Sequence, residues 1–172
     1  MISAVVLAAG AATRFGSPKQ LLLLPYVLER LEEAPVDEIV VVSGAYPVEE
    51  SDRLQLGQAR VVACPDWELG PGASLRCGLA ALGDDIEAAL IVLADGPYLD
   101  RRAIERVLAH RDQADFVAAS YEGVRSHPAV LSRAGWANVP DDGGRELDVL
   151  LVACDDLTPP GDIDTPDLAK NL

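Results

Sequence analysis

The sequence predicts one α/β domain over residues 1–172, with a doubly wound, mostly parallel sheet and helices on both of its faces. Three observations predict this fold. A chain of 172 residues is long enough for one domain with a proper core and too short for two. Short apolar runs rich in β-branched residues recur along the chain, as expected of strands that are buried on both faces. Amphipathic helical patterns alternate with these runs, which is the order of elements in parallel α/β sheets.

Five apolar runs are predicted to form the strands of this sheet. The first, at residues 2–8, reads Ile-Ser-Ala-Val-Val-Leu-Ala and has no polar face. The next four are expected at residues 38–43, 59–63, 88–94 and 115–120. Beyond them the pattern weakens, and we expect a short extended piece at 128–131, a loop at 138–144 and a strand at 148–154.

Helices are predicted in three of the connections. The first is expected to begin at Pro25, because proline suits the first turn of a helix, and to place Val27 and Leu31 on one face. The second is expected to follow Ser74 and the third Asp100, since both residue types are good N-caps.

The charge of the chain excludes several classes of partner. It carries 28 acidic residues against 14 basic ones, a net charge of -14. Such a surface repels nucleic acids and anionic lipids, so neither is an expected partner. The longest apolar run is too short to span a membrane, and the first residues lack the basic segment of a secretory signal. A cytoplasmic protein is therefore expected.

The cysteines predict neither a zinc site nor a disulfide framework. Cys64, Cys77 and Cys154 are odd in number and widely spaced, without a Cys-x-x-Cys pair. We interpret them as thiols of a reducing compartment.

The loop after the first predicted strand has the residues needed to bind phosphates. Ligands of open parallel sheets bind beyond the carboxyl ends of the strands. Here Gly10 and Gly16 permit a close approach to an anion, and Arg14 and Lys19 supply a forked and a point-like cation. The alternative is a surface loop with two solvated cations. Local positive charge would outweigh the distant acidic surface, because the Debye length is about 8 Å at physiological salt.

Asp95 follows the predicted strand at residues 88–94 and should leave the sheet at the same edge. Its expected role is to hold Mg²⁺, which bridges phosphate oxygens and neutralises developing charge. The alternative is a carboxylate that caps the turn before Gly96 and Pro97.

With these segments in view, the sequence resembles the MobA-like nucleotidyltransferases, the cytidylyl- and guanylyltransferases of molybdenum-cofactor maturation. The matching segments run in family order over nearly the whole chain. They are Leu7-Ala8-Ala9-Gly10 with Arg14-Phe15-Gly16 and Lys19, Gly72-Ala73-Ser74-Leu75 with Gly78-Leu79, Leu93-Ala94-Asp95-Gly96-Pro97, Gly143-Gly144-Arg145, and Asp162-Ile163-Asp164-Thr165-Pro166. The resemblance implies a fold like that of nucleotide-diphospho-sugar transferases.

What the resemblance implies for function is Mg²⁺-dependent transfer of a nucleoside monophosphate from a nucleoside triphosphate to a phosphorylated acceptor such as molybdopterin, with release of pyrophosphate. Catalysis would then depend on Arg14, Lys19 and Asp95. The implied nucleotide-binding residues are Leu7, Ala8, Ala9, Gly10, Arg14, Gly16, Lys19, Asp66, Gly72 and Ser74. The implied metal ligands are Asp95, Asp162 and Asp164, although either of the last two could instead be a structural cap.

The acceptor side departs from the family pattern. The family's Gly-x-Pro acceptor segment reads Ser126-His127-Pro128 here, and little space separates Arg145 from the next predicted strand. By resemblance His127, Pro128 and Arg145 would bind the acceptor, although a histidine before proline is also a common structural turn. Ala9, where guanylyl members tend to carry glycine, favours CTP over GTP.

Two other functions remain open from the sequence. The chain could transfer nucleotides to a sugar or alcohol phosphate, because one fold serves many acceptors. It could also be a catalytically inactive nucleotide-binding regulator. A transient contact with a molybdoenzyme or a cofactor carrier is expected if molybdopterin is the acceptor.

Overall fold

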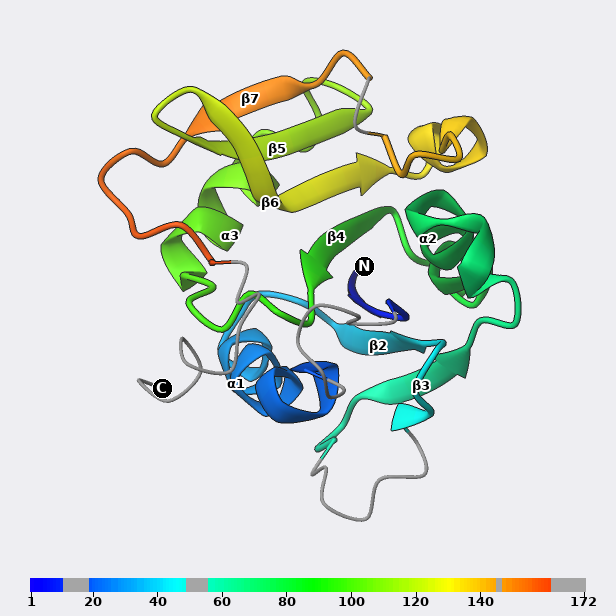
Figure 1. Cartoon of the computed structure of the whole chain (residues 1–172). Coiled ribbons are helices and arrows are strands. Elements are labelled where there is room, and N and C mark those ends of the chain that lie inside the picture. The colour runs from blue at the N-terminus through cyan, green and yellow to red at the C-terminus, as the bar shows by residue number, and fades with distance from the viewer. Residues whose placement is uncertain (11–18, 49–55, 145–146, 162–172) are drawn as a thin grey trace.

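A computed structural model describes residues 1–10, 19–48, 56–144 and 147–161 and has the predicted α/β fold (Figure 1). A seven-stranded sheet has the strand order β3-β2-β1-β4-β6-β5-β7. The strands are β1 (Ile2–Ala8), β2 (Glu38–Ser43), β3 (Arg60–Ala63), β4 (Ala88–Leu93), β5 (Phe116–Tyr121), β6 (Val124–Ser132) and β7 (Leu150–Ala153). The helices are α1 (Lys19–Glu32), α2 (Pro71–Ala80) and α3 (Arg101–Ala109), with short 3-10 turns η2 (Trp67–Leu69) and η3 (Ala134–Asn138).

The sheet is mostly parallel, as predicted. Among the described strands β6 alone is antiparallel, and it pairs with β4 on one side and β5 on the other. This strand is longer than the extended piece predicted at 128–131. The prediction missed its first half, which carries the polar residues Arg125, Ser126 and His127. Those residues lack the apolar pattern by which buried strands are recognised.

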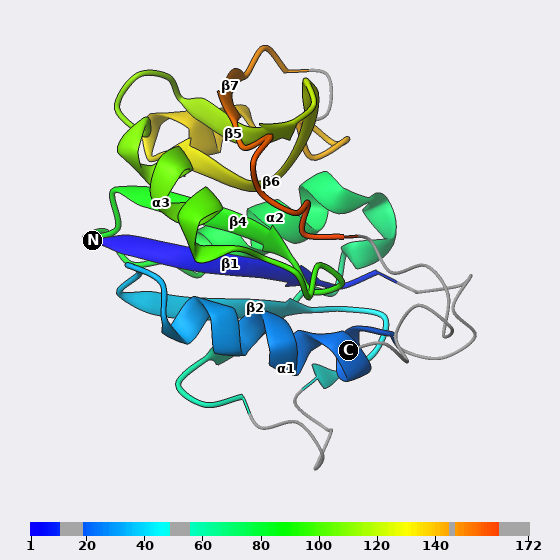
Figure 2. The ribbon, with the colours of Figure 1, turned by 90° about the vertical axis from the view of Figure 1, so that its left-hand side faces the viewer.

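Helices cover both faces of the sheet, which buries the central strands completely. In Figures 1 and 2, α1 and α3 lie on one face and α2 on the other. Alternate residues of β1 point into two separate clusters: Ala4 and Val6 pack with α1 and α3, whereas Val5 packs with α2. All three side chains are 0% exposed. The run of apolar residues in β1 therefore serves two cores at once.

Helix α1 begins earlier than predicted. It starts at Lys19 and contains Pro25 in its interior, so the expectation that Pro25 opens the helix is wrong. A proline inside a helix loses one backbone hydrogen bond. Here Leu23 and Leu24, which precede it, are both 0% exposed in the core. Their burial, each contributing about 1.5 to 3 kcal/mol, offsets that loss.

Helix α2 also begins before its predicted cap. Gly70 is the N-cap and Pro71 the first helical residue, whereas Ser74 lies within the first turn and donates its backbone N–H to the Gly70 carbonyl at 3.4 Å. The prediction that Ser74 caps the helix is wrong, because Pro71 suits the first helical position better. For α3 the prediction is confirmed, since Asp100 Oδ1 accepts the backbone N–H of Arg102 at 2.8 Å.

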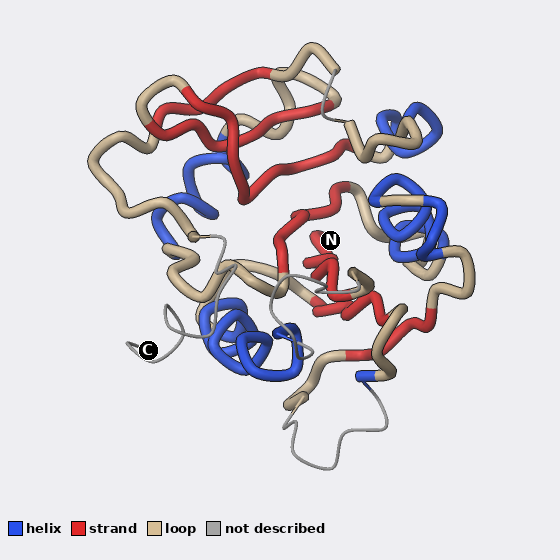
Figure 3. Tube along the Cα trace, in the orientation of Figure 1, coloured by secondary structure: helices blue, strands red, loops and turns tan. Residues whose placement is uncertain are grey.

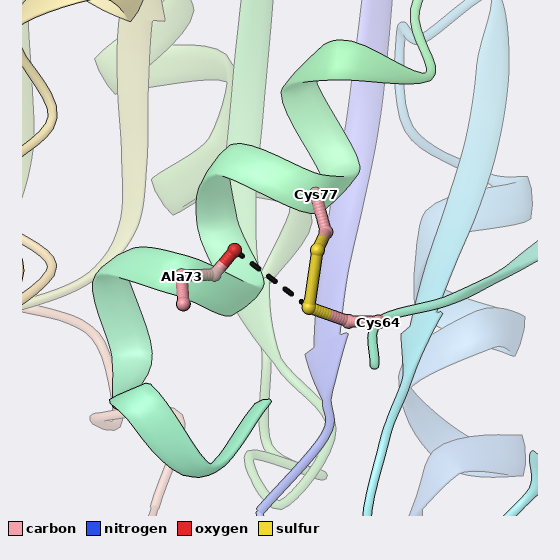
Figure 4. Close-up of a disulfide and its surroundings, with 3 residues drawn as sticks. All are labelled: Cys64, Ala73 and Cys77. Atoms are coloured by element: carbon pink, nitrogen blue, oxygen red, sulfur yellow. Dashed lines mark hydrogen bonds between the residues drawn. A yellow bond between two sulfur atoms is a disulfide. The ribbon is translucent and has the colours of Figure 1, made fainter. Parts of the chain in front are cut away.

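The prediction that the cysteines form no disulfide is wrong. Cys64, just after β3, is bonded to Cys77 in α2, with the two Cα atoms 5.8 Å apart (Figure 4). The pairing could not be read from the spacing, because it arises when α2 packs back onto the sheet beside the end of β3. Cys154 is a free, buried thiol.

The irregular parts of the fold lie toward its C-terminal third. Residues 139–144 and 154–161 are loops on either side of the short strand β7 (Figure 3). Among the described residues no helix is both long and apolar enough to cross a membrane.

Candidate functional site

The ends of β1 and β4 leave the sheet side by side. The two strands are parallel neighbours that pair Leu7 with Leu93, and the N–H of Ala94 donates to the Leu7 carbonyl at 3.1 Å. The segment that ends at Gly10 and the segment that holds Asp95 therefore start from one edge of the sheet. This carboxyl edge is where open α/β sheets bind their ligands.

A pocket of about 580 Å³ opens at this edge. The strand ends contribute Leu7, Leu93 and Gly96 to its wall, and Leu75 of α2 lines it from the side. Strand β6 contributes residues 125–127, and the loops at 142–143 and 159–161 complete the wall. A mostly apolar cleft with a few polar groups is typical of a small-molecule site.

The nucleotide-binding residues that the resemblance implies around β1 differ in where they lie: one lines the pocket, two are buried in the core and one is exposed. Leu7 lines the pocket, and Gly10 is exposed beyond the strand. Ala8 and Ala9 are buried, at 1% and 4% exposure. A Cβ built on Gly44 would lie 2.7 Å from that of Ala9, so the methyl group of Ala9 packs against the loop after β2. This methyl belongs to the α2-side core rather than to the pocket wall.

The second implied nucleotide segment lies around α2. Asp66 is exposed at the start of η2, and Ser74 is 6% exposed inside α2. Neither residue lines the pocket, but Pro71 and Leu75 of the same helix do.

Packing explains why residue 72 is glycine, and the sequence did not reveal this reason. Its N–H donates to the Asp141 carbonyl at 3.0 Å. A Cβ on Gly72 would lie 2.1 Å from the carbonyl oxygen of Pro140, which no real structure tolerates. Glycine is therefore needed here because the 139–144 loop lies directly on the start of α2.

Asp95 occupies the turn after β4. It is half-buried, its Oδ1 atom is buried, and the residues Leu93 and Gly96 on either side line the pocket. A carboxylate at the meeting point of two strand ends is the donor type that Mg²⁺ and Mn²⁺ prefer. In the described part of the chain no group of three or more His, Cys, Asp and Glu side chains could hold a metal ion.

Several of the predicted site residues lie outside the described residues. They are Arg14, Gly16, Arg145, Asp162 and Asp164. Lys19 is described only as the first residue of α1, which follows the β1 loop along the chain. Their roles stay predictions.

The predicted acceptor segment lines the opposite wall of the pocket. His127 contributes to this wall, and Pro128, joined to it by a cis peptide bond, is buried. Burial, and to a lesser extent the positive charge of Arg125, lower the pKa of His127 to about 4. The imidazole is thus neutral at pH 7 and offers one hydrogen-bond donor and one acceptor.

Sequence reasoning missed Arg125, and it predicted the loop at residues 138–144 without placing it against α2 and β6 at the pocket. Arg125 lines the pocket and donates from Nη1 to the Gly144 carbonyl at 2.7 Å. One signal could have found it: Arg125 and His127 are two residues apart in an extended segment, and such residues share a strand face.

The 139–144 loop connects the two walls. On the α2 side Arg76 donates from Nη1 to the Val139 carbonyl at 3.0 Å and from Nη2 to Asp141 Oδ1 at 2.9 Å. On the β6 side it is held through Arg125. These contacts join residues more than 60 positions apart along the chain, from α2 to the loop.

Known proteins resemble this chain in sequence and in fold. The chain is 36% identical over 124 residues to the bifunctional protein GlmU of Mycobacterium sp. strain KMS, a match that covers 64% of this chain and 25% of the relative. The chain thus spans about a quarter of the length of the curated relatives it matches.

Among solved structures, Rv0371c of Mycobacterium tuberculosis H37Rv superposes with a TM-score of 0.82 at 26% identity, covering 99% of this chain and 96% of that one. The manganese complex of Rv0371c superposes with a TM-score of 0.80 at 24% identity, covering 99% and 97% of the two chains. A CMP:2-keto-3-deoxy-manno-octonic acid synthetase complexed with CTP shares the fold at 13% identity, with a TM-score of 0.72 and coverage of 99% and 95%.

The sequence also matches the family of MobA-like NTP transferase domains over residues 4–155, which is most of the chain. The matched span contains both strand ends, α2 and β6, and so all of the described pocket except its last loop. The family model describes an NTP transferase domain, which makes nucleotidyl transfer the reaction class of this chain. The chain belongs to the MobA-like NTP transferase family.

Proposed function

We propose that the chain transfers a nucleoside monophosphate from a nucleoside triphosphate, with CTP favoured over GTP, to a phosphorylated acceptor such as molybdopterin, and releases pyrophosphate. The observation that carries this proposal is the pocket at the joint edge of β1 and β4, which is lined by Leu93 and Gly96 of the turn that holds Asp95 and by β6. Family membership supports the reaction class.

The nucleotide would bind on the β1 and α2 side. Leu7, Ala8, Ala9 and Gly10 would support the base and ribose, and Arg14, Gly16 and Lys19 would hold the phosphates, with Asp66, Gly72 and Ser74 enclosing the nucleoside. The pairing of Leu7 with Leu93, from which the segments that hold Gly10 and Asp95 both leave the sheet, supports this assignment. Because Ala9 is buried against Gly44, its influence on the choice between CTP and GTP would act through the course of the backbone.

The acceptor's phosphate oxygen would attack the α-phosphorus of the nucleotide. The bond from this phosphorus to the bridging oxygen breaks, and the pyrophosphate leaves with the electron pair. The acceptor phosphate is already anionic, so no strong general base is required. The task of the protein is to bring two anions together in line, which Arg14 and Lys19 would do by binding phosphate oxygens.

Asp95 would hold a divalent cation, with Asp162 and Asp164 as further ligands. Mg²⁺ is the proposed ion, and the manganese complex of Rv0371c supports a divalent metal in this fold. When bound, the ion would neutralise charge on the phosphate oxygens. Asp95 is the one of these three proposed ligands that lies in the described residues. Its carboxylate fits the role by chemistry, because hard cations take oxygen ligands.

The acceptor would bind on the β6 side, at His127, Pro128 and Arg145. A sugar or alcohol phosphate is the second candidate acceptor, and its support is that one fold serves many acceptors. The reaction would take place in the cytoplasm, where nucleoside triphosphates are available, and a molybdopterin acceptor would imply a transient contact with a molybdoenzyme or cofactor carrier.

The test is to incubate the protein with each of the four nucleoside triphosphates, Mg²⁺ and one acceptor at a time, and to measure pyrophosphate release. We expect release with CTP and molybdopterin, and less with GTP. Release only with a sugar or alcohol phosphate would select the second candidate acceptor. Binding of nucleotide without release in any mixture would instead identify an inactive nucleotide-binding regulator.

A further inference from the structure

Arg125 is the one permanent cation among the described residues that line the pocket. It lies two residues before His127 on β6, and both side chains contribute to the same wall. The family resemblance assigns no role to Arg125. A role for it has to be inferred from its contacts in the pocket wall.

The guanidinium group of Arg125 is held in place within the pocket wall. Its Nη1 atom donates to the Gly144 carbonyl at 2.7 Å, and burial lowers the pKa of the group. Gly144 has φ of 92°, and a Cβ there would lie 3.8 Å from Nη2 of Arg125. Guanidinium groups form strong, charge-assisted hydrogen bonds with phosphate and carboxylate oxygens. An arginine that is held in position in the wall of a ligand pocket is therefore suited to bind an anionic ligand group.

We propose that Arg125 binds the phosphate of the acceptor and that the apolar wall beside it holds the acceptor's uncharged body. The wall around it supports this division, because Leu99, Ala129 and Pro160 are apolar and His127 supplies a neutral hydrogen-bonding group. This assignment rests on the proposed function and adds a specificity-determining residue to it. The acceptor class is a phosphate ester with an apolar body.

Asp142 provides an opposing charge in the same pocket. Its Oδ1 atom accepts the N–H of Gly144 at 2.8 Å, and its negative charge acts on Arg125. An incoming phosphate would be repelled by Asp142 and attracted by Arg125. The two residues should therefore have opposite effects on anion binding.

Arg76 is the matched control for a purely structural role. Like Arg125 it holds the 139–144 loop through a backbone carbonyl, but it does not line the pocket. If Arg125 only fastens this loop, Arg76→Gln and Arg125→Gln should have the same consequences. If it binds phosphate, their consequences should differ.

The experiment is calorimetric titration of the whole protein with phenyl phosphate, and with benzyl alcohol as its uncharged counterpart. We expect Arg125→Gln to weaken phenyl phosphate binding by about 10- to 100-fold, and Arg125→Lys to weaken it less. Asp142→Asn should strengthen binding, and Arg76→Gln should change it by less than about threefold. Benzyl alcohol binding should be the same in all variants.

Three results would overturn the proposal: equal losses in Arg76→Gln and Arg125→Gln, an equal loss for benzyl alcohol, or wild-type protein that binds phenyl phosphate no better than benzyl alcohol. Thermal unfolding of each variant identifies any that do not fold, and Arg125→Lys then provides the comparison. Because the readout is binding, it does not depend on turnover, and the proposed reaction can fail while this assignment holds.

The disulfide carries a second, independent inference. Cys64 and Cys77 close a loop of 13 positions that contains η2 and the start of α2 (Figure 4). Two residues of that loop, Pro71 and Leu75, line the pocket. Cys64 is 2% exposed, whereas Cys77 is only partly buried, so Cys77 is the more accessible residue of the pair.

We infer that this bond is a reversible redox switch of the α2 wall. A thiolate of a dithiol reductant attacks Sγ of Cys77, the disulfide bond breaks, and Cys64 leaves as a thiolate that takes up a proton. The second thiol of the reductant then attacks the mixed disulfide, which releases Cys77 and leaves the reductant oxidised. Reduction frees the closed loop and loosens the wall that holds Pro71.

The test compares oxidised protein with protein treated with dithiothreitol, by hydrogen exchange of residues 65–76, thermal unfolding and binding of CTP with Mg²⁺. We expect reduction to raise exchange in this segment, to lower Tm by about 5 to 10 °C and to weaken CTP binding. Cys77→Ser should match the reduced protein and ignore dithiothreitol, whereas Cys154→Ser should respond as the wild type does. Two results would contradict this inference irrespective of catalysis. One is that reduction of the wild type changes neither hydrogen exchange nor Tm, and the other is that Cys77→Ser responds to dithiothreitol as the wild type does.

Discussion

The two walls of the pocket are built by different means. The wall proposed to bind the nucleotide, here called the nucleotide wall, consists of parallel strand ends and the start of α2, where Leu7, Leu75 and Leu93 present apolar side chains from regular elements. The wall proposed to bind the acceptor, here called the acceptor wall, consists of the antiparallel strand β6 and two loops, and it holds the described charged lining groups Arg125 and Asp142. The core of the sheet thus fixes the first wall, whereas side-chain contacts to loops position the second.

This difference indicates where specificity resides. The β1 and β4 backbones cannot move without disturbing two cores, because alternate residues of each strand are buried on opposite faces. The 139–144 loop depends on a few contacts from Arg76, Gly72 and Arg125. Changes on the acceptor wall can therefore alter the ligand while the fold is retained, as expected of a fold that serves many acceptors.

The largest expected effect is on the nucleotide wall, at Asp95. Asp95→Ala should reduce Mg²⁺-dependent pyrophosphate release by about 1000-fold or more, because the carboxylate that would hold the cation is lost. Circular dichroism should show an intact fold. Asp84→Ala, at an exposed ion pair with Arg133, is the control and should retain activity. Near wild-type release by Asp95→Ala would refute its role as a metal ligand.

The next effect concerns the phosphate-binding loop. Lys19→Ala should lower turnover by about 100-fold, because one cation that would neutralise the phosphates is removed. The chain has one other lysine, Lys170, and Lys170→Ala should leave turnover unchanged. Steady-state rates of both variants at saturating nucleotide make the comparison, and equal rates would remove Lys19 from the site.

Gly72→Ala tests how strongly the two walls are coupled. The added Cβ would meet the Pro140 carbonyl, so the 139–144 loop must shift, and we expect the acceptor KM to rise about tenfold and stability to fall by about 1 to 3 kcal/mol. Gly123→Ala is the control: Gly123 has φ of 76° but nothing within 4 Å of a Cβ. It should lose about 1 kcal/mol of stability through backbone strain without any change in the acceptor KM.

The last expected effect, which acts on stability and not on turnover, is the acid sensitivity of the acceptor wall. The pKa of His127 is about 4 in the folded protein and about 6.5 in an unfolded chain. Between these pH values the unfolded state binds more protons, so stability falls as the pH drops from 6.5 to 4, by up to about 3 kcal/mol. Urea unfolding at pH 7 and 4.5 should show this loss in the wild type.

The control for this pH dependence is the other histidine. His127→Gln should lose most of the stability change between pH 7 and 4.5, whereas His110→Gln should retain it. His110 lies at the end of α3 with Nδ1 2.8 Å from the Arg106 carbonyl, away from the pocket. An equal pH dependence in wild type and His127→Gln would show that other groups govern acid stability.

Much of the fold could be predicted because the strands are buried on both faces. The five predicted apolar runs match β1 to β5 with at most one residue of difference at either end. The start of α3 was also predictable, since Asp100 satisfies its N-terminal N–H groups locally. Where tertiary packing overrides local preference, prediction failed: Pro25 lies inside α1 because Leu23 and Leu24 before it and Leu28 after it are buried.

The candidate site was predictable only where it depends on sheet topology. Parallel neighbouring strands place Asp95 near the end of β1, and this follows from the order of elements. The role of Arg125 and the Cys64–Cys77 bond depend instead on how a loop and a helix pack against distant parts of the chain. No local pattern records such packing, so these features required the structure.

The most direct test of the account is a crystal structure of the protein with CTP and Mg²⁺. The account predicts the triphosphate and the metal at the shared edge of β1 and β4, between Gly10 and Asp95, with the β6 wall and Arg125 left open for the acceptor. A nucleotide bound on another surface, with Asp95 remote from its phosphates, would contradict it.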